Sequence, residues 1–263
     1  MPNDFPRASQ SQLKKWARLL EAKFRREDGL FMAEGVKVAE ELLKSDWQAE
    51  ALFVLPEKIS YWEKCIARAE GRIPVYQLMR SEWKKLSQDK EPEGLIAIVK
   101  SKEPPALSSF LKSSKGHVLI LHEINNPGNL GALARSAYWF GFSGMLLGSH
   151  SVDWTNSKVI RASMGGIFHL TVFPNVDLTA WLPEIKRDYL LVGSDVRHGA
   201  SPHPLAKKAA LLLGSESHGL PDHLLEQADE HWRIPGNIQA DSLSLPQAAA
   251  IMMYEMCNIG EGR

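Results

Sequence analysis

The 263-residue sequence has only two cysteines, no long apolar run and no net charge. Cys65 and Cys257 lie far apart and outside any CxxC spacing, which argues against a disulfide framework and a thiolate metal site. The longest apolar runs, such as AAIMMY, are far shorter than the roughly 20 residues that a membrane span needs. The first residues also lack the apolar stretch of a signal peptide. We therefore expect a cytoplasmic protein with no membrane partner.

Signals for metal, dinucleotide and serine-hydrolase chemistry are equally weak. Two histidine pairs are each five residues apart, whereas a helical zinc pair is four apart: His198 with His203, and His218 with His223. The GxGxxG fingerprint of an NAD site is absent from the glycine-containing turn near Gly128, and LLLGSESHGL lacks the GxSxG spacing of a nucleophile elbow. We expect no metal and no nucleophilic hydrolysis.

The charge balance of 31 basic against 31 acidic residues argues against a polybasic surface for nucleic acid. The distribution is less even, because seven cations stand against four anions between Ser11 and Lys37. On one continuous helix, Lys14, Arg18 and Arg25 would lie near one face. A solvated helix face and an RNA-binding face are both consistent with this pattern.

The apolar pattern divides the chain into two α/β halves. In the first hundred residues, helical and strand patterns alternate from SQLKKWARLLEAKF to GLIAIV. Segment 101–116 is rich in Ser, Lys and Pro, which is typical of a linker. Stronger strand patterns follow, and they predict a mostly parallel sheet with helices on both faces: HVLILHEI, GMLLG, IFHLTVF, YLLVGS, AALLLGSE and HWRIPG. We expect domains at 1–100 and 117–263.

Four segments of the second half differ from ordinary core strands and turns. NNPGNLGALAR is a turn leading into a helix with Arg135, and such a turn presents backbone N–H groups to an anion. SKVIRASMGGIFHL places small residues after Arg161, and LLLGSESHGL ends a buried strand at Gly214 and Glu216. RIPGNIQADSLSLPQAAA carries serines before an apolar helix. Taken singly, these segments also fit a plain turn before a helix, a tight helix-to-strand turn, or helix-capping serines.

In this order, the segments resemble the SpoU (TrmH-like) branch of the SPOUT superfamily, RNA 2′-O-ribose methyltransferases that use S-adenosylmethionine. NNPGNLGALAR, LLLGSESHGL and RIPGNIQADSLSLPQAAA resemble the three family motifs, and KVIRASMGGIFHL resembles the segment between the first two. The stretch LEAKFRREDGLFMAEGVKVAEELL looks like the start of the small L30e-like substrate-binding domain that precedes many of these catalytic domains.

The resemblance implies a trefoil-knotted catalytic domain, a homodimer, and RNA as substrate, ribosomal in preference to transfer RNA. It assigns cofactor contacts to Gly214, Ile234, Leu243 and Ser194, with Asp195 as an alternative to Ser194. Arg135 would face the target ribose and its phosphate, held by Asn129, Glu216 and Ser242. We expect further RNA contacts from a set of cations: Arg161, Lys14, Arg18 and Arg25.

One position departs from the family pattern. Ser244 stands where the third motif commonly has asparagine, and its side chain is shorter. Together with the near-neutral charge, this substitution leaves open an RNA-binding module that has lost turnover. A further alternative is a nucleotide-binding α/β enzyme that uses PGNLG as a phosphate turn and binds NAD or ATP.

Overall fold

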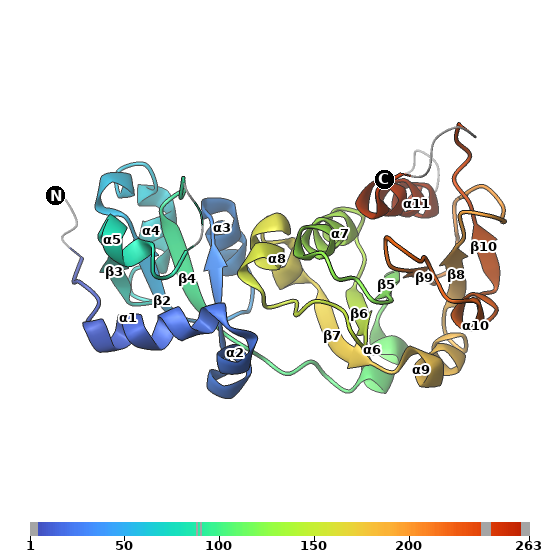
Figure 1. Cartoon of the computed structure of the whole chain (residues 1–263), viewed down its shortest axis with the longest axis horizontal. Helices are drawn as coiled ribbons and strands as arrows, with labels where there is room; N and C mark the ends of the chain where they lie inside the picture. Colours follow the sequence, from blue (N-terminus) through green and yellow to red (C-terminus); the bar gives the residue numbers. More distant parts are fainter. Residues whose placement is uncertain (1–4, 88, 90, 238–242, 259–263) are drawn as a thin grey trace. The chain divides into compact units, whose positions relative to one another are not determined.

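The computed structural model describes residues 5–87, 89, 91–237 and 243–258, which form two compact units (Figure 1). The first unit comprises Met1–Glu103 together with Thr155–Phe168, and the second comprises Pro104–Trp154 and His169–Arg263. The inserted segment joins the first unit because Phe168 packs with Phe31 and Trp47, with ring centroids 6.4 and 5.7 Å away.

A four-stranded sheet forms the centre of the first unit, with the order β1-β4-β2-β3. Strand β4 (Leu95–Lys100) runs antiparallel to β1 (Leu30–Glu34) and to β2 (Ala49–Val54), whereas β3 (Val75–Gln77) runs parallel to β2. The helices that accompany it are α1 (Gln10–Ala17), α2 (Ala22–Asp28), α3 (Val36–Lys44), α4 (Glu63–Ala69), α5 (Arg80–Trp83) and α8 (Ser157–Ala162). Their apolar side chains and those of the strands form the buried core.

The first predicted helix is divided in the structure. α1 begins at a Ser9 capping box and ends at Ala17, a 3-10 turn η1 (Arg18–Leu20) follows, and α2 starts only after Glu21. Glu21 is extended, with φ −96° and ψ 133°. The guanidinium of Arg25 donates hydrogen bonds of 3.0 Å to the carbonyls of Leu19 and Leu20, which satisfies them outside a regular helix.

The second unit contains a six-stranded sheet in which every pair is parallel, with the order β10-β8-β9-β5-β6-β7. The strands are β5 (Val118–Leu121), β6 (Gly144–Gly148), β7 (Thr171–Val176), β8 (Leu190–Ser194), β9 (Ala209–Leu213) and β10 (Glu230–Trp232). Parallel strands are covered on both faces, which explains why the central ones are continuous apolar runs.

Helices cover both faces of this sheet, as the sequence predicts (Figure 1). α7 (Pro127–Trp139) and α11 (Leu245–Cys257) pack together on one face. On the other face, α6 (Leu107–Ser113), α9 (Leu178–Ile185) and α10 (Asp222–Leu225) bury their apolar side chains in a cluster with Ile120, Leu146 and Leu212. The α/β architecture is therefore confirmed, while the trefoil knot stays a prediction.

Three segments differ from the sequence expectations. Segment 101–116 contains α6, because Phe110 and Leu111 are buried in the second unit's core despite the polar residues around them. The predicted strand IFHLTVF begins as a 3-10 turn, η3 (Gly166–His169), and only β7 is extended. The predicted strand HWRIPG stops at Trp232, and Arg233 instead donates its N–H to the carbonyl of Ala200.

No helix in the described part of the chain is both long and apolar enough to cross a membrane. Across the same residues, no group of three or more His, Cys, Asp or Glu side chains is arranged to hold a metal ion.

Candidate functional site

The carboxyl edge of the second unit's sheet brings together three of the positions assigned to cofactor contacts. In the parallel pairing, Trp232 of β10 lies beside Ser194 of β8, and Gly193 lies beside Leu212 of β9. Ser194 is the last residue of β8. It therefore lies between Gly214, which follows β9, and the segment that continues from β10 to Ile234. Open α/β sheets bind ligands at this edge, where the strands give way to loops.

The tight hairpin after β9 contains two positions, Gly214 and Gly219, that favour glycine. Ser215 and Gly219 form an antiparallel bridge, in which the N–H of Gly219 donates to the Ser215 carbonyl at 2.9 Å. A Cβ on Gly214 would lie 2.1 Å from the Gly219 carbonyl carbon and 2.3 Å from the Leu220 nitrogen. Gly219 itself has a φ of +67°, in the left-handed region that favours glycine. The chain therefore turns back directly after β9, with only backbone at Gly214.

A side-chain hydrogen bond joins this hairpin to the turn after β5. The Asn126 side-chain oxygen accepts from the N–H groups of Gly128 and Asn129, at 2.8 and 3.3 Å, and so caps α7. The side-chain amide of Asn129, in the first turn of α7, donates to a carboxylate oxygen of Glu216 at 2.5 Å. Two residues predicted to act together therefore meet, although 87 positions separate them.

Arg135 lies away from this pair. It follows Asn129 by six positions, which corresponds to a rise of about 9 Å along an α-helix and places the two side chains on different faces. Arg135 is exposed and forms no ion pair with a carboxylate of the described residues. Its neighbours on the same face of α7 are Tyr138 and Trp139, three and four residues further on.

The remaining positions of the third motif are only partly placed. Ile234 is half-buried, and the side chain of Leu243 is exposed. Ser242, predicted to hold the ribose, lies outside the described residues. Ser244 is the N-cap residue of α11, but its hydroxyl accepts no capping hydrogen bond. The hydroxyl that replaces the usual asparagine is therefore not committed to capping the helix.

A buried carboxylate follows β8 directly, at the position that the sequence offers as an alternative to Ser194. Asp195 is 8% exposed, and it accepts hydrogen bonds from the backbone N–H of Arg197 at 2.8 Å and from its guanidinium at 3.3 Å. Burial acts to raise the pKa of Asp195, but these hydrogen bonds outweigh it and hold the pKa below its usual value. Arg197 also bonds Asp222 at 3.1 Å, so the loop after β8 is fixed to the start of α10.

Sequence reasoning missed His122, which lies at the same edge directly after β5. Burial, with smaller contributions from His223 and His150, lowers its pKa despite the nearby Glu123, so the imidazole is neutral at neutral pH. Glu123 has a left-handed φ of 53°. The available signal was a polar residue at the end of a buried strand, and this signal also occurs in ordinary turns.

The cations predicted to bind RNA have different environments within the first unit. Lys14 and Arg18 are exposed and line one hollow. Arg25 does not share their face, because it is 5% exposed and bonds the carbonyls of Leu19 and Leu20 and the hydroxyl of Thr155. The break between α1 and α2 is the reason, since it rotates Arg25 away from the face of a continuous helix.

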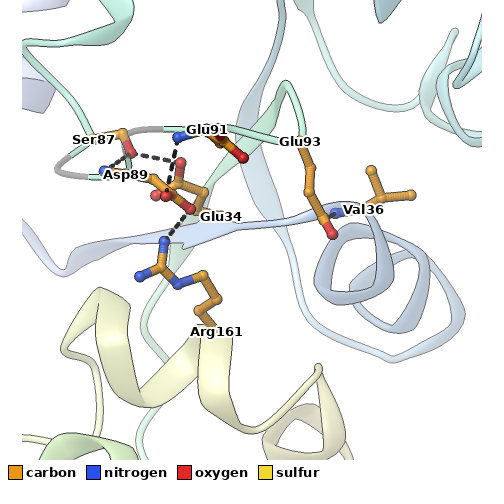
Figure 2. A network of polar contacts seen from close by, with 7 residues as sticks. All are labelled: Glu34, Val36, Ser87, Asp89, Glu91, Glu93 and Arg161. Carbon is orange, nitrogen blue, oxygen red and sulfur yellow. Dashed lines mark hydrogen bonds and ion pairs between the residues drawn. The ribbon is translucent and has the colours of Figure 1, made fainter.

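Arg161 is part of a polar network in the first unit (Figure 2). Its guanidinium forms an ion pair with Asp89 at 2.5 Å and remains partly exposed. Ser87 donates to the buried carboxyl of Glu34 at 2.6 Å and accepts from the N–H of Asp89 at 3.0 Å. Burial raises the pKa of Glu34, although Ser87 and Arg161 act to lower it. Part of the donor capacity of Arg161 is thus used inside the protein.

Two family models match different parts of the chain. Residues 116–254 match the model of the SpoU rRNA Methylase family, and residues 10–97 match the MRM3-like substrate binding domain. A 23S rRNA (guanosine(2553)-2′-O)-methyltransferase, RlmP of Bacillus subtilis, is 28% identical over 95% of this chain and 97% of its own.

Solved structures of similar length share the fold. An RNA 2′-O ribose methyltransferase is 30% identical with a TM-score of 0.80, over 95% of this chain and 96% of its own. An AdoMet-bound rRNA methyltransferase from Sinorhizobium meliloti is 25% identical, also with a TM-score of 0.80 and the same coverage. Because the family model matches more than half of the chain, and includes the Asn129–Glu216 pair and the hairpin at Gly214, the protein belongs to the SpoU rRNA methylase family.

Proposed function

We propose that the protein transfers the methyl group of S-adenosylmethionine to a ribose 2′-hydroxyl of ribosomal RNA. The observation that carries the proposal is the Asn129–Glu216 hydrogen bond, which joins two motif loops at the carboxyl edge of the sheet. It is supported by relatives whose names give 23S ribosomal RNA as substrate and 2′-O-methylation as reaction, and by an AdoMet-bound structure of the same fold. Ribosomal RNA is preferred to transfer RNA for the same reason.

The residues at this edge fit the proposed cofactor. Gly214 follows β9 at this edge and has no side chain, and backbone N–H and C=O groups suit the edge of an adenine. Ile234 and Leu243 offer apolar surface, and Ser194 a hydroxyl, at the ends of the neighbouring segments. When bound, the sulfonium would supply an activated methyl group. No step of the transfer requires a metal.

The chain's own residues would position the acceptor. Arg135 keeps its charge at any ordinary pH, so it is suited to hold the phosphate and ribose of the target nucleotide. Asn129 and Glu216 fix the two loops on which the acceptor must lie. Methyl transfer needs an in-line approach of the hydroxyl, so alignment contributes much of the rate. Ser242 is proposed to complete the ribose contacts.

We also propose that the protein is a homodimer. The adjacent helices α7 and α11 expose large apolar side chains, and Trp139 is 82% exposed. Tyr138 lies beside it on α7, and α11 adds Ile251 and Tyr254, the latter 6.3 Å from the ring of Phe140. Exposed apolar surface of this kind marks association sites. Because Arg135 shares the face of Trp139, a partner subunit seated there would help to complete the site around it. The cytoplasm is the proposed place of action.

The direct test is methyl transfer to protein-free 23S ribosomal RNA from cells that lack the gene. With methyl-labelled S-adenosylmethionine, we expect label at one nucleotide whose 3′ bond resists alkaline hydrolysis, as a 2′-O-methyl group requires. Arg135→Ala is the control, and transfer no greater than that of the control would refute the proposal.

A second function, RNA binding without turnover, is motivated by Ser244 in place of the usual asparagine. Calorimetry separates the two functions, because only the methyltransferase requires binding of S-adenosylmethionine.

A further inference from the structure

A hollow on the first unit is lined by α1, η1, Glu21 and the residues after α5. It has a volume of about 430 Å³ and includes Lys14, Arg18 and Lys85 in its lining. We propose that this cationic hollow binds one unpaired nucleotide of the substrate RNA through its phosphate. The inference rests on the proposed function, which makes RNA the substrate, and adds where on the first unit that RNA is held.

The charges in the hollow favour an anion. Three cations face a single carboxylate, that of Glu21. Lys14 and Lys85 form no ion pair with any residue that the structure describes, so neither ammonium group is neutralised by a described carboxylate. Elsewhere on α1, by contrast, Lys15 is paired with Glu50 at 2.9 Å. Unpaired cations that converge from two separate elements are the typical footprint of phosphate binding.

Arg18 is held in an orientation suited to the same ligand. Its guanidinium lies 3.8 Å from the centroid of the Phe24 ring, and its only described carboxylate contact, to Glu27, is a long one of 3.9 Å. The contact with the ring restrains the guanidinium, and the long contact with Glu27 leaves N–H groups able to donate hydrogen bonds. A guanidinium edge matches two phosphate oxygens.

The size and lining of the hollow limit what it can hold. Leu13 and Ala17 are the apolar residues of the lining, and only Ala17 is partly exposed. Its volume lies within the range of about 300 to 1,000 Å³ that is typical of ligand sites, so the hollow has room for a single nucleotide. An aliphatic surface beside cations would take a ribose or base together with its phosphate. RNA readers commonly bind such nucleotides in unpaired loops.

The test compares two double variants by their affinity for protein-free 23S ribosomal RNA at several salt concentrations. Lys14→Ala with Lys85→Ala removes the two unpaired ammonium groups of the hollow. Lys64→Ala with Lys112→Ala is the matched control, because both lysines are exposed and unpaired among the described residues and neither lines the hollow. Calorimetry with S-adenosylmethionine and thermal unfolding verify that both variants keep the fold.

We expect the hollow variant to bind RNA more weakly and with a smaller dependence on salt. On a single strand, each phosphate that a lysine neutralises contributes about 0.7 to the slope of log affinity against log salt, so removal of both lysines should reduce the slope by about 1.4. KM for RNA should rise while kcat changes little. An affinity and slope equal to those of the control would overturn the inference.

Two other results separate the alternatives. If the hollow variant binds naked RNA as the control does but fails to bind ribosomal particles, the hollow takes a ribosomal protein and the RNA assignment is refuted. If wild-type protein shows the lysine-dependent RNA binding but transfers no methyl group, the proposed function fails while the assignment of the hollow stands.

Discussion

The hydrogen bond between Asn129 and Glu216 allows a substitution that changes charge with almost no change in shape. In Asn129→Asp, a carboxylate oxygen replaces the amide nitrogen that lies 2.5 Å from Glu216. A hydrogen bond to a charged group contributes about 1.5–3 kcal/mol, and exposure of Glu216 and partial exposure of Asn129 favour the lower value. Repulsion of two charges near 4 Å in water adds about 1 kcal/mol. At 1.4 kcal/mol per factor of ten, kcat/KM should fall by about tenfold to a hundredfold.

The pair can also be exchanged, which gives the prediction its control. Asn129→Asp combined with Glu216→Gln restores one amide and one carboxylate with their positions reversed. We expect the double variant to recover much of the wild-type activity, with a coupling energy of about 1–2 kcal/mol in a double-mutant cycle. The assay is the rate of methyl transfer to 23S ribosomal RNA, together with the Kd for S-adenosylmethionine. Effects that add to within about 0.5 kcal/mol would refute the claim that this contact aligns the site.

Three further substitutions test other parts of the account. Gly214→Ala places a Cβ against the backbone of Gly219, so it should destabilise the protein by about 1–3 kcal/mol in urea unfolding and weaken cofactor binding. Gly236→Ala, where a Cβ meets nothing within 4 Å, should leave the stability unchanged. Trp139→Glu should convert the proposed dimer to a monomer in analytical ultracentrifugation, whereas Tyr61→Glu, also at an exposed aromatic residue, should leave the mass unchanged. Burial raises the pKa of Glu34, so its contribution to stability is fullest below the ordinary value of 4.5 and is lost as pH rises through the folded-state pKa. As pH rises above 4.5, the free energy of unfolding in urea should therefore fall less for Glu34→Gln than for wild type. An equal fall in both proteins would contradict a raised pKa for Glu34.

The strands of the second unit could be predicted because parallel strands buried on both faces read as continuous apolar runs. VLIL and AALLL are such runs, and both are fully buried at the centre of the sheet. α6 could not be predicted in the same way, since only Phe110 and Leu111 among its polar neighbours are deeply buried. Burial of so few residues leaves no periodic signal.

Contacts between distant segments limited the prediction of side-chain roles. Lys14, Arg18 and Arg25 share a face only if the helix is continuous, and a hydrogen bond from Arg25 to Thr155, 130 positions away, accompanies the break. Arg161 reads as a free cation beside small residues, but its partner Asp89 is 72 positions away. The motif order did indicate that Asn129 and Glu216 act together, although only the fold places one amide against one carboxylate.

A crystal structure of the protein with S-adenosylhomocysteine would test directly whether the motif loops form the cofactor site. We expect the ligand at the carboxyl ends of β8, β9 and β10, with its adenine against the backbone of Gly214 and Ile234 and its sulfur directed toward the turn that carries Asn129. A ligand bound at another edge of the sheet, or these loops far apart in the complex, would contradict the account.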